Sequence, residues 1–177
     1  GVHASITDSG ITIKQAGTYR IHGTLDNGSI IIDDPKNAHI KIVLDDAHIT
    51  CDDHAPIYIK QADKVVLTLA DGTDNTLEDG TVYHSEDTTD TTPSATIYSE
   101  DDLTINGNGS LRITANYNNA IQSKDDLKIV SGTLQITAAN DGLVGRDLLA
   151  VKDASITLNS TGDAMKSTNE EQSQKGN

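Results

Sequence analysis

The sequence predicts an all-β fold in which the chain winds into a parallel β-helix with coils of about 22 residues. The first observation behind this prediction is a repeat in the second half of the chain. The apolar residue near the start of each similar segment recurs at Ile97, Ile121, Leu143 and Met165, at spacings of 24, 22 and 22 residues. A period of this length indicates one supersecondary unit stacked repeatedly along an axis.

The second observation is the alternation of apolar and polar residues inside each repeat, as in Leu103–Ile105, Leu127–Ile129 and Leu134–Ile136. Period-two alternation in short, β-branched runs predicts strands, and the Gly, Asn and Asp residues between them are typical of turns. At about 3.3 Å per residue, one coil has a perimeter of roughly 70 Å. The chain has no Phe and no Trp, which fits a narrow solenoid filled by Ile, Leu and Val better than a globular core rich in aromatic residues.

Taken in order, the elements predict one β-helix domain over residues 1–177. Residues 1–28 form an atypical first coil, which must cover the apolar end of the stack. The second coil contains the strands around Ile30–Ile32 and Ile40–Leu44. The third contains Ile57–Ile59 and Val65–Leu69, and regular coils then continue from Ala95.

Two segments interrupt this regularity. Ile57 and Ile97 are 40 residues apart, and the excess over one coil falls in the Asp-, Thr- and Ser-rich run at about residues 78–93, which we expect to leave the solenoid as an insertion. The polar tail at residues 168–177 begins a second departure. Because the period stops in mid-coil, we expect a truncated or open C-terminal end, and an open apolar end favours end-to-end self-association.

The excess of acidic residues excludes some classes of binding partner. Thirteen Lys and Arg residues against 27 Asp and Glu give a net charge of −14, which argues against binding to nucleic acid or to anionic membrane surfaces. The acidity favours bound cations or simply a solvated exterior. No apolar run is long enough for a membrane span. The single cysteine, Cys51, is expected to be a small hydrophobic residue of the core.

One predicted column places the oxygen-bearing side chains of Asn119, Asp141 and Asp163 above one another on consecutive coils, about 4.8 Å apart. Amide and carboxylate oxygens at this spacing suit Ca²⁺. Asn and Asp also tolerate the left-handed backbone conformations of turns. The column is therefore interpreted either as a metal site or as turn chemistry.

A second column holds Asp101, Asp125 and Asp147, with Asp102 and Asp126 beside it. The adjoining column places Lys124 and Arg146 above the acid Glu100. Three interpretations remain open: a neutralised surface ladder that contributes little to stability, a second cation site, or an acidic-sugar site in which Lys124 and Arg146 bind carboxylates.

A third column contains Tyr58 and Tyr98, which become neighbours once the insertion is left out of the count. Outward-facing tyrosines can support a sugar ring through ring contact and hydroxyl hydrogen bonds, and Tyr117, in a turn, would extend the platform. Paired tyrosines are also ordinary cross-strand packing on a sheet surface.

These patterns resemble a known family. Four segments carry the likeness and cover nearly the whole chain in order and spacing: Gly17–Leu25, Ala55–Ile59, Leu67–Asn75 and Leu103–Leu111. They are similar to the bacterial carbohydrate-binding β-helix family known for binding cellulose and pectin-type polysaccharides. Asp141-Gly142 and Gly162-Asp163-Ala164 also resemble its repeated Asp-Gly turns.

The resemblance implies a right-handed, pectate-lyase-like β-helix with bound Ca²⁺, an extracellular or cell-surface location, and binding to cellulose or acidic plant polysaccharides without established cleavage. An alternative is a polysaccharide lyase, which would need Ca²⁺ and a base. Arg146, beside Asp125 and Asp147, is the only candidate for that base. A structural stalk or adhesin solenoid is the third possibility.

Overall fold

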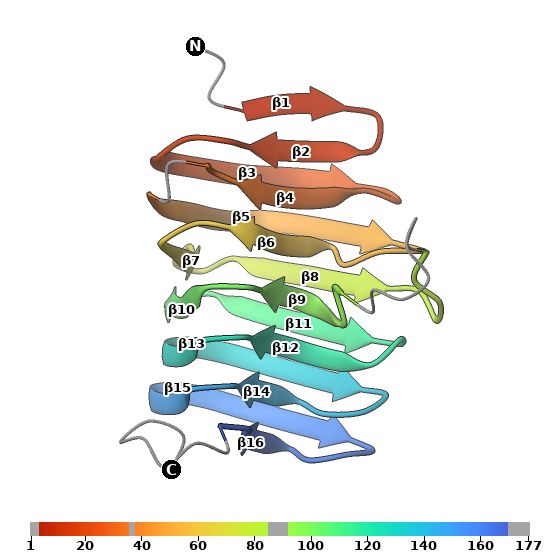
Figure 1. Ribbon diagram of the computed structural model, residues 1–177, viewed down its shortest axis with the longest axis vertical. Coiled ribbons are helices and arrows are strands. Elements are labelled where there is room, and N and C mark those ends of the chain that lie inside the picture. Colours follow the sequence, from red (N-terminus) through yellow and green to blue (C-terminus); the bar gives the residue numbers. More distant parts are fainter. Residues whose placement is uncertain (1–3, 36–37, 85–91, 170–177) are drawn as a thin grey trace.

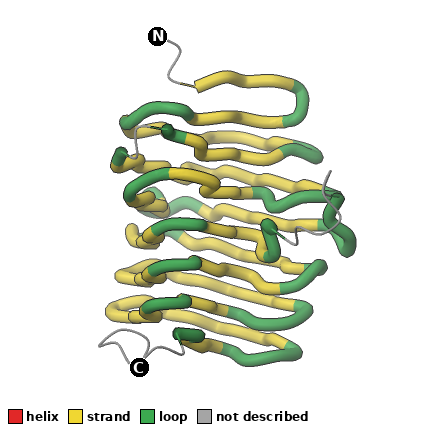
Figure 2. Tube along the Cα trace, in the orientation of Figure 1, coloured by secondary structure: helices red, strands yellow, loops and turns green. Residues whose placement is uncertain are grey.

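The computed structural model describes residues 4–35, 38–84 and 92–169. Within these residues every regular element is a strand, and the strands form a solenoid of about six turns (Figures 1 and 2). In Figure 1, from β2 onward, the chain passes from right to left in the front strands and returns from left to right behind them while it descends. This path makes a right-handed helix, as the resemblance implied.

Two sheets form the walls of the solenoid. The front sheet of Figure 1 contains β1 (Ala4–Thr7), β2 (Gly10–Ile13), β4 (Ser29–Asp33), β6 (Ile57–Gln61), β9 (Ala95–Ser99), β12 (Asn119–Ser123), β14 (Leu143–Gly145) and β16 (Met165–Ser167). The second sheet contains β3 (Gly17–Leu25), β5 (His39–Cys51), β7 (Lys64–Leu69), β8 (Asp74–Asp79), β10 (Asp102–Gly107), β11 (Ser110–Ala115), β13 (Asp126–Ala138) and β15 (Leu148–Ser160).

The strand register confirms the predicted period. Ile57 is paired with Ile97, Ile97 with Ile121, Ile121 with Leu143, and Leu143 with Met165. All these pairings are parallel. The spacings of 40, 24, 22 and 22 residues in the sequence therefore correspond to single steps from one coil to the next.

Columns of inward-facing aliphatic side chains fill the interior. Ile57, Ile97, Ile121 and Leu143 are each no more than 1% exposed, and they face similar columns from the second sheet. Cys51 is buried with a free thiol, as predicted. The buried residues of the hydrophobic core cluster are all aliphatic, in keeping with a sequence that contains neither Phe nor Trp.

The first coil differs from the others. Strand β1 folds back on β2 as an antiparallel hairpin, whereas the other strand pairs are parallel. The β1 strand therefore lies along the N-terminal edge of the front sheet (Figure 1). Its Ile6 side chain is 80% exposed.

The insertion begins later than predicted. Glu78 and Asp79 belong to β8, which is paired with β5 and β11, so the chain leaves the solenoid only at Gly80. The inward positions of β8 are Asn75, Leu77 and Asp79. Because two of these three are polar, the strand lacks the alternation of apolar and polar residues that would predict it. Residues 85–91 of the insertion and residues 170–177 of the tail lie outside the described residues.

At the C-terminal end, the inward positions of the last coil are partly uncovered. Val151 and Met165 are 43% and 45% exposed, although their partners one coil earlier, Ile129 and Leu143, are fully buried. Among the described residues, no strand follows β16 in the front sheet or β15 in the second sheet. Within the same residues, no helix is long and apolar enough to cross a membrane.

Candidate functional site

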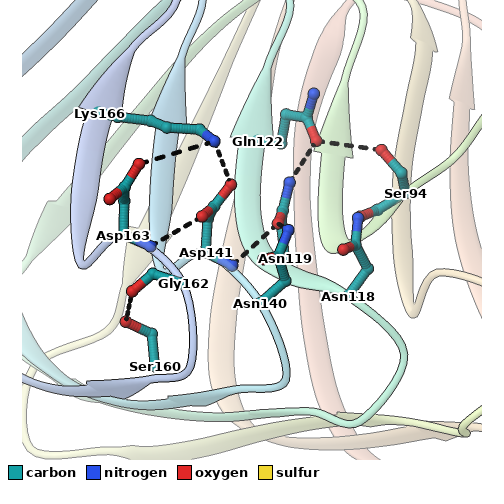
Figure 3. A network of polar contacts seen from close by, with 10 residues as sticks. All are labelled: Ser94, Asn118, Asn119, Gln122, Asn140, Asp141, Ser160, Gly162, Asp163 and Lys166. Atoms are coloured by element: carbon teal, nitrogen blue, oxygen red, sulfur yellow. Dashed lines mark hydrogen bonds and ion pairs between the residues drawn. The ribbon is translucent and has the colours of Figure 1, made fainter.

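The residues of the predicted oxygen column lie in a line across successive coils, at or just before the starts of β12, β14 and β16 (Figure 3). The Asp141 backbone N–H donates to Asn119 Oδ1 at 3.0 Å, and the Asp163 backbone N–H donates to Asp141 Oδ1 at 2.9 Å. Asn140 Nδ2 also donates to Asn119 Oδ1, at 3.1 Å. A side-chain oxygen on each coil therefore binds the turn of the next coil, which is a turn-stabilising role.

The Lys166 side chain, which was not among the predicted site residues, reaches into this column. Lys166 Nζ lies 2.5 Å from Asp141 Oδ2 and 3.9 Å from Asp163 Oδ2 (Figure 3). The Asp141 side chain is only 5% exposed, whereas that of Asp163 is 68% exposed. The ammonium group thus balances the buried carboxylate. A Ca²⁺ ion bound to Asp141 would have to replace this contact, so calcium at this column stays a prediction.

The second acidic column is also in register, but its carboxylates do not converge. The Asp147 backbone N–H donates to the Asp125 carbonyl at 3.1 Å. Asp101 Oδ2 accepts the Ala62 N–H at 2.9 Å, and burial raises the pKa of the Asp101 carboxyl. Asp147 Oδ1 accepts from Asn169 Nδ2 at 3.3 Å. Two of the three predicted ligands are thus engaged separately.

A convergent group forms instead from Asp102, Asp125 and Asp126, each of which offers a carboxylate oxygen within 4.8 Å of the others. Asp126 is 6% exposed, and its Oδ2 lies 2.8 Å from Lys128 Nζ. Of the predicted ligands in this column, only Asp125 belongs to the group. Asp102 and Asp126 join it because the chain turns into β10 and β13 at these residues.

In the predicted column of Glu100, Lys124 and Arg146, one pair of neighbouring coils forms an ion pair. Lys124 Nζ lies 3.2 Å from Glu100 Oε2 on the preceding coil. Arg146 follows on the next coil, where its backbone N–H donates to the Ser123 carbonyl at 3.0 Å. Its side chain is exposed, and no ion pair joins it to another described residue. Arg146 is therefore open to a ligand.

The two tyrosines of the third column are neighbours, as predicted. Tyr58 is paired with Tyr98 across β6 and β9, and their ring centroids are 5.9 Å apart in an edge-to-face arrangement. Tyr98 is only 1% exposed, and burial raises the pKa of its phenol, whose hydroxyl hydrogen-bonds with Thr92 and Lys124. This corrects the expectation of an open two-ring platform, because residues next to the insertion cover Tyr98.

Other rings extend the aromatic surface from Tyr58 away from Tyr98. The His54 ring lies 5.6 Å from Tyr58 and 6.2 Å from Tyr83, and Tyr83 stacks on Tyr117 with centroids 4.1 Å apart and an interplanar angle of 17°. We call the half-buried rings of Tyr58, His54, Tyr83 and Tyr117 the aromatic array. His54 and Tyr83 were not predicted, because His54 lies in a turn and Tyr83 in the aperiodic insertion.

A buried carboxylate holds one end of the aromatic array. Asp79, 3% exposed, accepts the Tyr83 hydroxyl at 2.6 Å, the Asn116 N–H at 2.5 Å and the Tyr117 N–H at 3.3 Å. The Thr96 hydroxyl donates to it at 2.9 Å. Burial raises the pKa of Asp79 despite these donors. One side chain thus fixes the insertion and the 116–117 turn against each other.

A further group that could hold a cation lies on the second sheet. His22, Asp45 and Asp46 place ligand atoms within 4.8 Å of one another, beside an irregularity in the pairing of β3 with β5. Arg20 Nε donates to Asp45 Oδ2 at 2.7 Å. Nothing in the period of the sequence marks this group, because the irregularity itself brings the residues together.

Comparison with known proteins identifies the family and supports the fold. A family model described as carbohydrate-binding domain-containing protein matches residues 7–177. A protein of the same description from Acetivibrio thermocellus is 45% identical over 134 residues, which are 76% of this chain and 47% of that protein. The chain thus spans about half the length of this relative.

A solved structure is similar over almost the whole chain. It is that of a polysaccharide lyase-like protein from C. thermocellum, determined as a gadolinium derivative, with a TM-score of 0.96 and 40% sequence identity. The match covers 99% of this chain and 71% of the solved one. Given the family model and the 45% identical relative, the chain belongs to the carbohydrate-binding domain-containing protein family.

Proposed function

We propose that this chain is a non-catalytic module that binds polysaccharide through the aromatic array, outside the cell or at the cell surface. The observation that carries the proposal is the stacked pair Tyr83 and Tyr117, continued by His54 and Tyr58. The exposed parts of these half-buried rings can contact the CH groups of a sugar ring, and their polar atoms can bind its hydroxyl groups. The array crosses several coils, so it suits a polymer better than a single sugar.

The ligand we propose is cellulose or an acidic plant polysaccharide. Lys124 and Arg146 favour a chain that bears carboxylates, because a guanidinium group can bind a carboxylate through two parallel hydrogen bonds. Arg146 is exposed and carries no ion pair with a described residue. Lys124 is already bound to Glu100, so Arg146 is the stronger of the two candidates.

We further propose that the module binds Ca²⁺. The group of Asp102, Asp125 and Asp126 supports this proposal, since three carboxylates within 4.8 Å offer the oxygen ligands that Ca²⁺ takes. Lys128 Nζ already lies 2.8 Å from Asp126 Oδ2, so a Ca²⁺ ion would share this carboxylate with the lysine or displace it. The column of Asn119, Asp141 and Asp163 is the other candidate, with the Lys166 contact opposing it.

The test is retention on insoluble cellulose and retardation in gels that contain polygalacturonate, each with excess CaCl₂ and with excess EDTA. Tyr117→Ala should weaken binding about tenfold, the effect of roughly 1.4 kcal/mol. Tyr117→Phe, which keeps the ring, is the matched control and should bind as the wild type does. If the wild-type protein is retained by neither polymer, the binding function is refuted and the stalk interpretation is favoured.

A second candidate is a polysaccharide lyase, favoured by the likeness to the polysaccharide lyase-like protein. Arg146 would then act as the base that removes a proton beside a uronate carboxylate, with Ca²⁺ acidifying that proton. Incubation with polygalacturonate and CaCl₂ would produce the ultraviolet absorbance of unsaturated uronates. An increase in absorbance that Arg146→Ala abolishes would establish this function in place of the non-catalytic one.

We also propose that the molecules self-associate through their C-terminal ends. The exposed Val151 and Met165 side chains lie on that end, and β15 and β16 are the last strands of their sheets in the part of the chain that the structure describes. Unpaired sheet edges with apolar side chains invite pairing with another chain. Sedimentation at increasing concentration should show dimers that Val151→Lys weakens, whereas a concentration-independent monomer would contradict this proposal.

A further inference from the structure

A row of outward-facing polar side chains crosses the second sheet. His48 is paired with Thr76, Thr76 with Arg112, Arg112 with Gln135, and Gln135 with Thr157. The row spans four strand spacings, which amount to about 19 Å. We call these five side chains the Arg112 groove. None of them belongs to the aromatic array or to the acidic columns.

The row lies over two adjoining hollows, each of about 210 Å³. Arg112 and Gln135 line both hollows, and His48 and Thr157 line one each. The floor of the first hollow is held firmly. Asn75, which is 1% exposed, accepts the Ala47 N–H at 2.9 Å and donates to the Ser110 carbonyl at 3.1 Å.

The hydrogen-bonding groups in this row are only partly used. Arg112 Nε donates to Gln135 Oε1 at 3.3 Å, and no other described residue accepts from the guanidinium group. His48 Nδ1 and Thr76 Oγ1 are 2.9 Å apart. The terminal guanidinium nitrogens, the Gln135 amide nitrogen and the exposed Thr157 hydroxyl remain available to a ligand, and together they offer both donors and acceptors.

The charges around the groove select the kind of ligand. Asp74 and Glu78 lie two residues to either side of Thr76 on β8, and both are exposed. A polyanion in the groove would meet these two carboxylates as well as the net charge of −14, and Arg112 alone would oppose them. A neutral chain rich in hydroxyl groups meets no such penalty and can use donors and acceptors alike.

We propose that the Arg112 groove is a second carbohydrate-binding surface, which takes an extended neutral polysaccharide chain running across the strands. This inference rests on the proposed polysaccharide-binding function. The groove is on the outer face of the second sheet, whereas Tyr58 of the aromatic array lies on the front sheet. One molecule can therefore hold two polysaccharide chains and bridge them.

The experiment measures binding and bridging separately. Binding is measured by retardation in gels containing hydroxyethyl cellulose, a neutral soluble polymer, or polygalacturonate. Bridging is measured by the light scattering of hydroxyethyl cellulose mixed with the protein. We expect the double variant Arg112→Ala with Gln135→Ala to bind the neutral polymer about tenfold more weakly and to lose the scattering increase, while it still binds insoluble cellulose through the aromatic array.

Lys152→Ala is the matched control, because it removes an exposed cation of the same sheet outside the groove. It should change neither measurement, and circular dichroism should show every variant folded. Unchanged retardation and scattering in the double variant would overturn the groove while leaving the aromatic array intact. A groove-dependent preference for polygalacturonate would overturn the choice of a neutral ligand. If Tyr117→Ala binds normally and only the double variant fails, the groove stands and the array does not.

Discussion

Asp141 offers the sharpest test of how the coils are held together, because the same residue is a turn-binding group and a proposed calcium ligand. Asp141→Ala removes the acceptor of the Asp163 backbone N–H and the partner of Lys166. Asp163→Ala is a matched control one coil away, since its side chain is 68% exposed. Both substitutions remove one carboxylate from the same column.

The structure sets the size of the two effects. A hydrogen bond to a charged group contributes about 1.5–3 kcal/mol. The Lys166 ion pair adds little, because its ammonium is one-third exposed and screened by water. We therefore expect Asp141→Ala to lower the free energy of unfolding by about 2 kcal/mol. In a chain of this size that loss corresponds to about 4–8 °C in Tm. Asp163→Ala should cost about 0.5 kcal/mol or less.

The assay is urea unfolding followed by circular dichroism, in excess EDTA and in excess CaCl₂. If the column only binds turns, the difference between wild type and Asp141→Ala is the same in both buffers. If Ca²⁺ binds there, the wild type gains stability in CaCl₂ and both variants lose that gain. Equal stability of Asp141→Ala and Asp163→Ala in EDTA would refute the turn-binding argument. Wild-type curves that coincide in the two buffers would refute calcium binding.

Three further predictions concern other parts of the chain. Burial raises the pKa of folded Asp79 above its ordinary value of 3.8, so the stability that this group contributes is complete below that value and is lost as pH rises through the raised pKa. The stability of wild type relative to Asp79→Asn should therefore fall as the pH rises above about 4, and a pH-independent difference in urea midpoint would contradict this. Gly107→Ala should destabilise by more than 3 kcal/mol or so, because its Cβ would lie 2.0 Å from the Leu69 carbonyl oxygen at a φ of +103°. Gly72→Ala, at a φ of +71° with open space around it, should cost only about 1 kcal/mol; equal urea midpoints for the two variants would show that the close approach is unimportant. Cys51, buried and 4% exposed, should react with a thiol reagent only as fast as the protein unfolds, and rapid labelling of the native protein would show local opening at β5.

The repeat accounts for most of the fold that could be predicted. Ile97, Ile121, Leu143 and Met165 were aligned from spacing alone, and the sheets pair them in that order. The same alignment placed Asn119, Asp141 and Asp163 in one file. Register is readable in this way because a one-residue slip would turn every inward side chain outward.

The candidate site was only partly predictable, and most of the misses come from segments that do not follow the period. His54 and Tyr83 complete the aromatic array from a turn and from the insertion, neither of which follows the period. Tyr98 is covered because Thr92 and Lys124 reach its hydroxyl, a contact that depends on the path of the chain as it returns to the solenoid. Lys166 does follow the period, because it comes one residue after Met165. Its long, flexible side chain can reach several acidic residues, so the period alone does not show which carboxylate it contacts.

The sequence by itself thus determined the all-β solenoid, the register of its coils and the residues that share a column, because strand alternation and coil length repeat along the chain. Only the tertiary structure decided which ring is buried, which carboxylates converge and which cation reaches Asp141. Those outcomes depend on side-chain reach and on the path of the aperiodic turns, and neither is encoded in a repeating spacing.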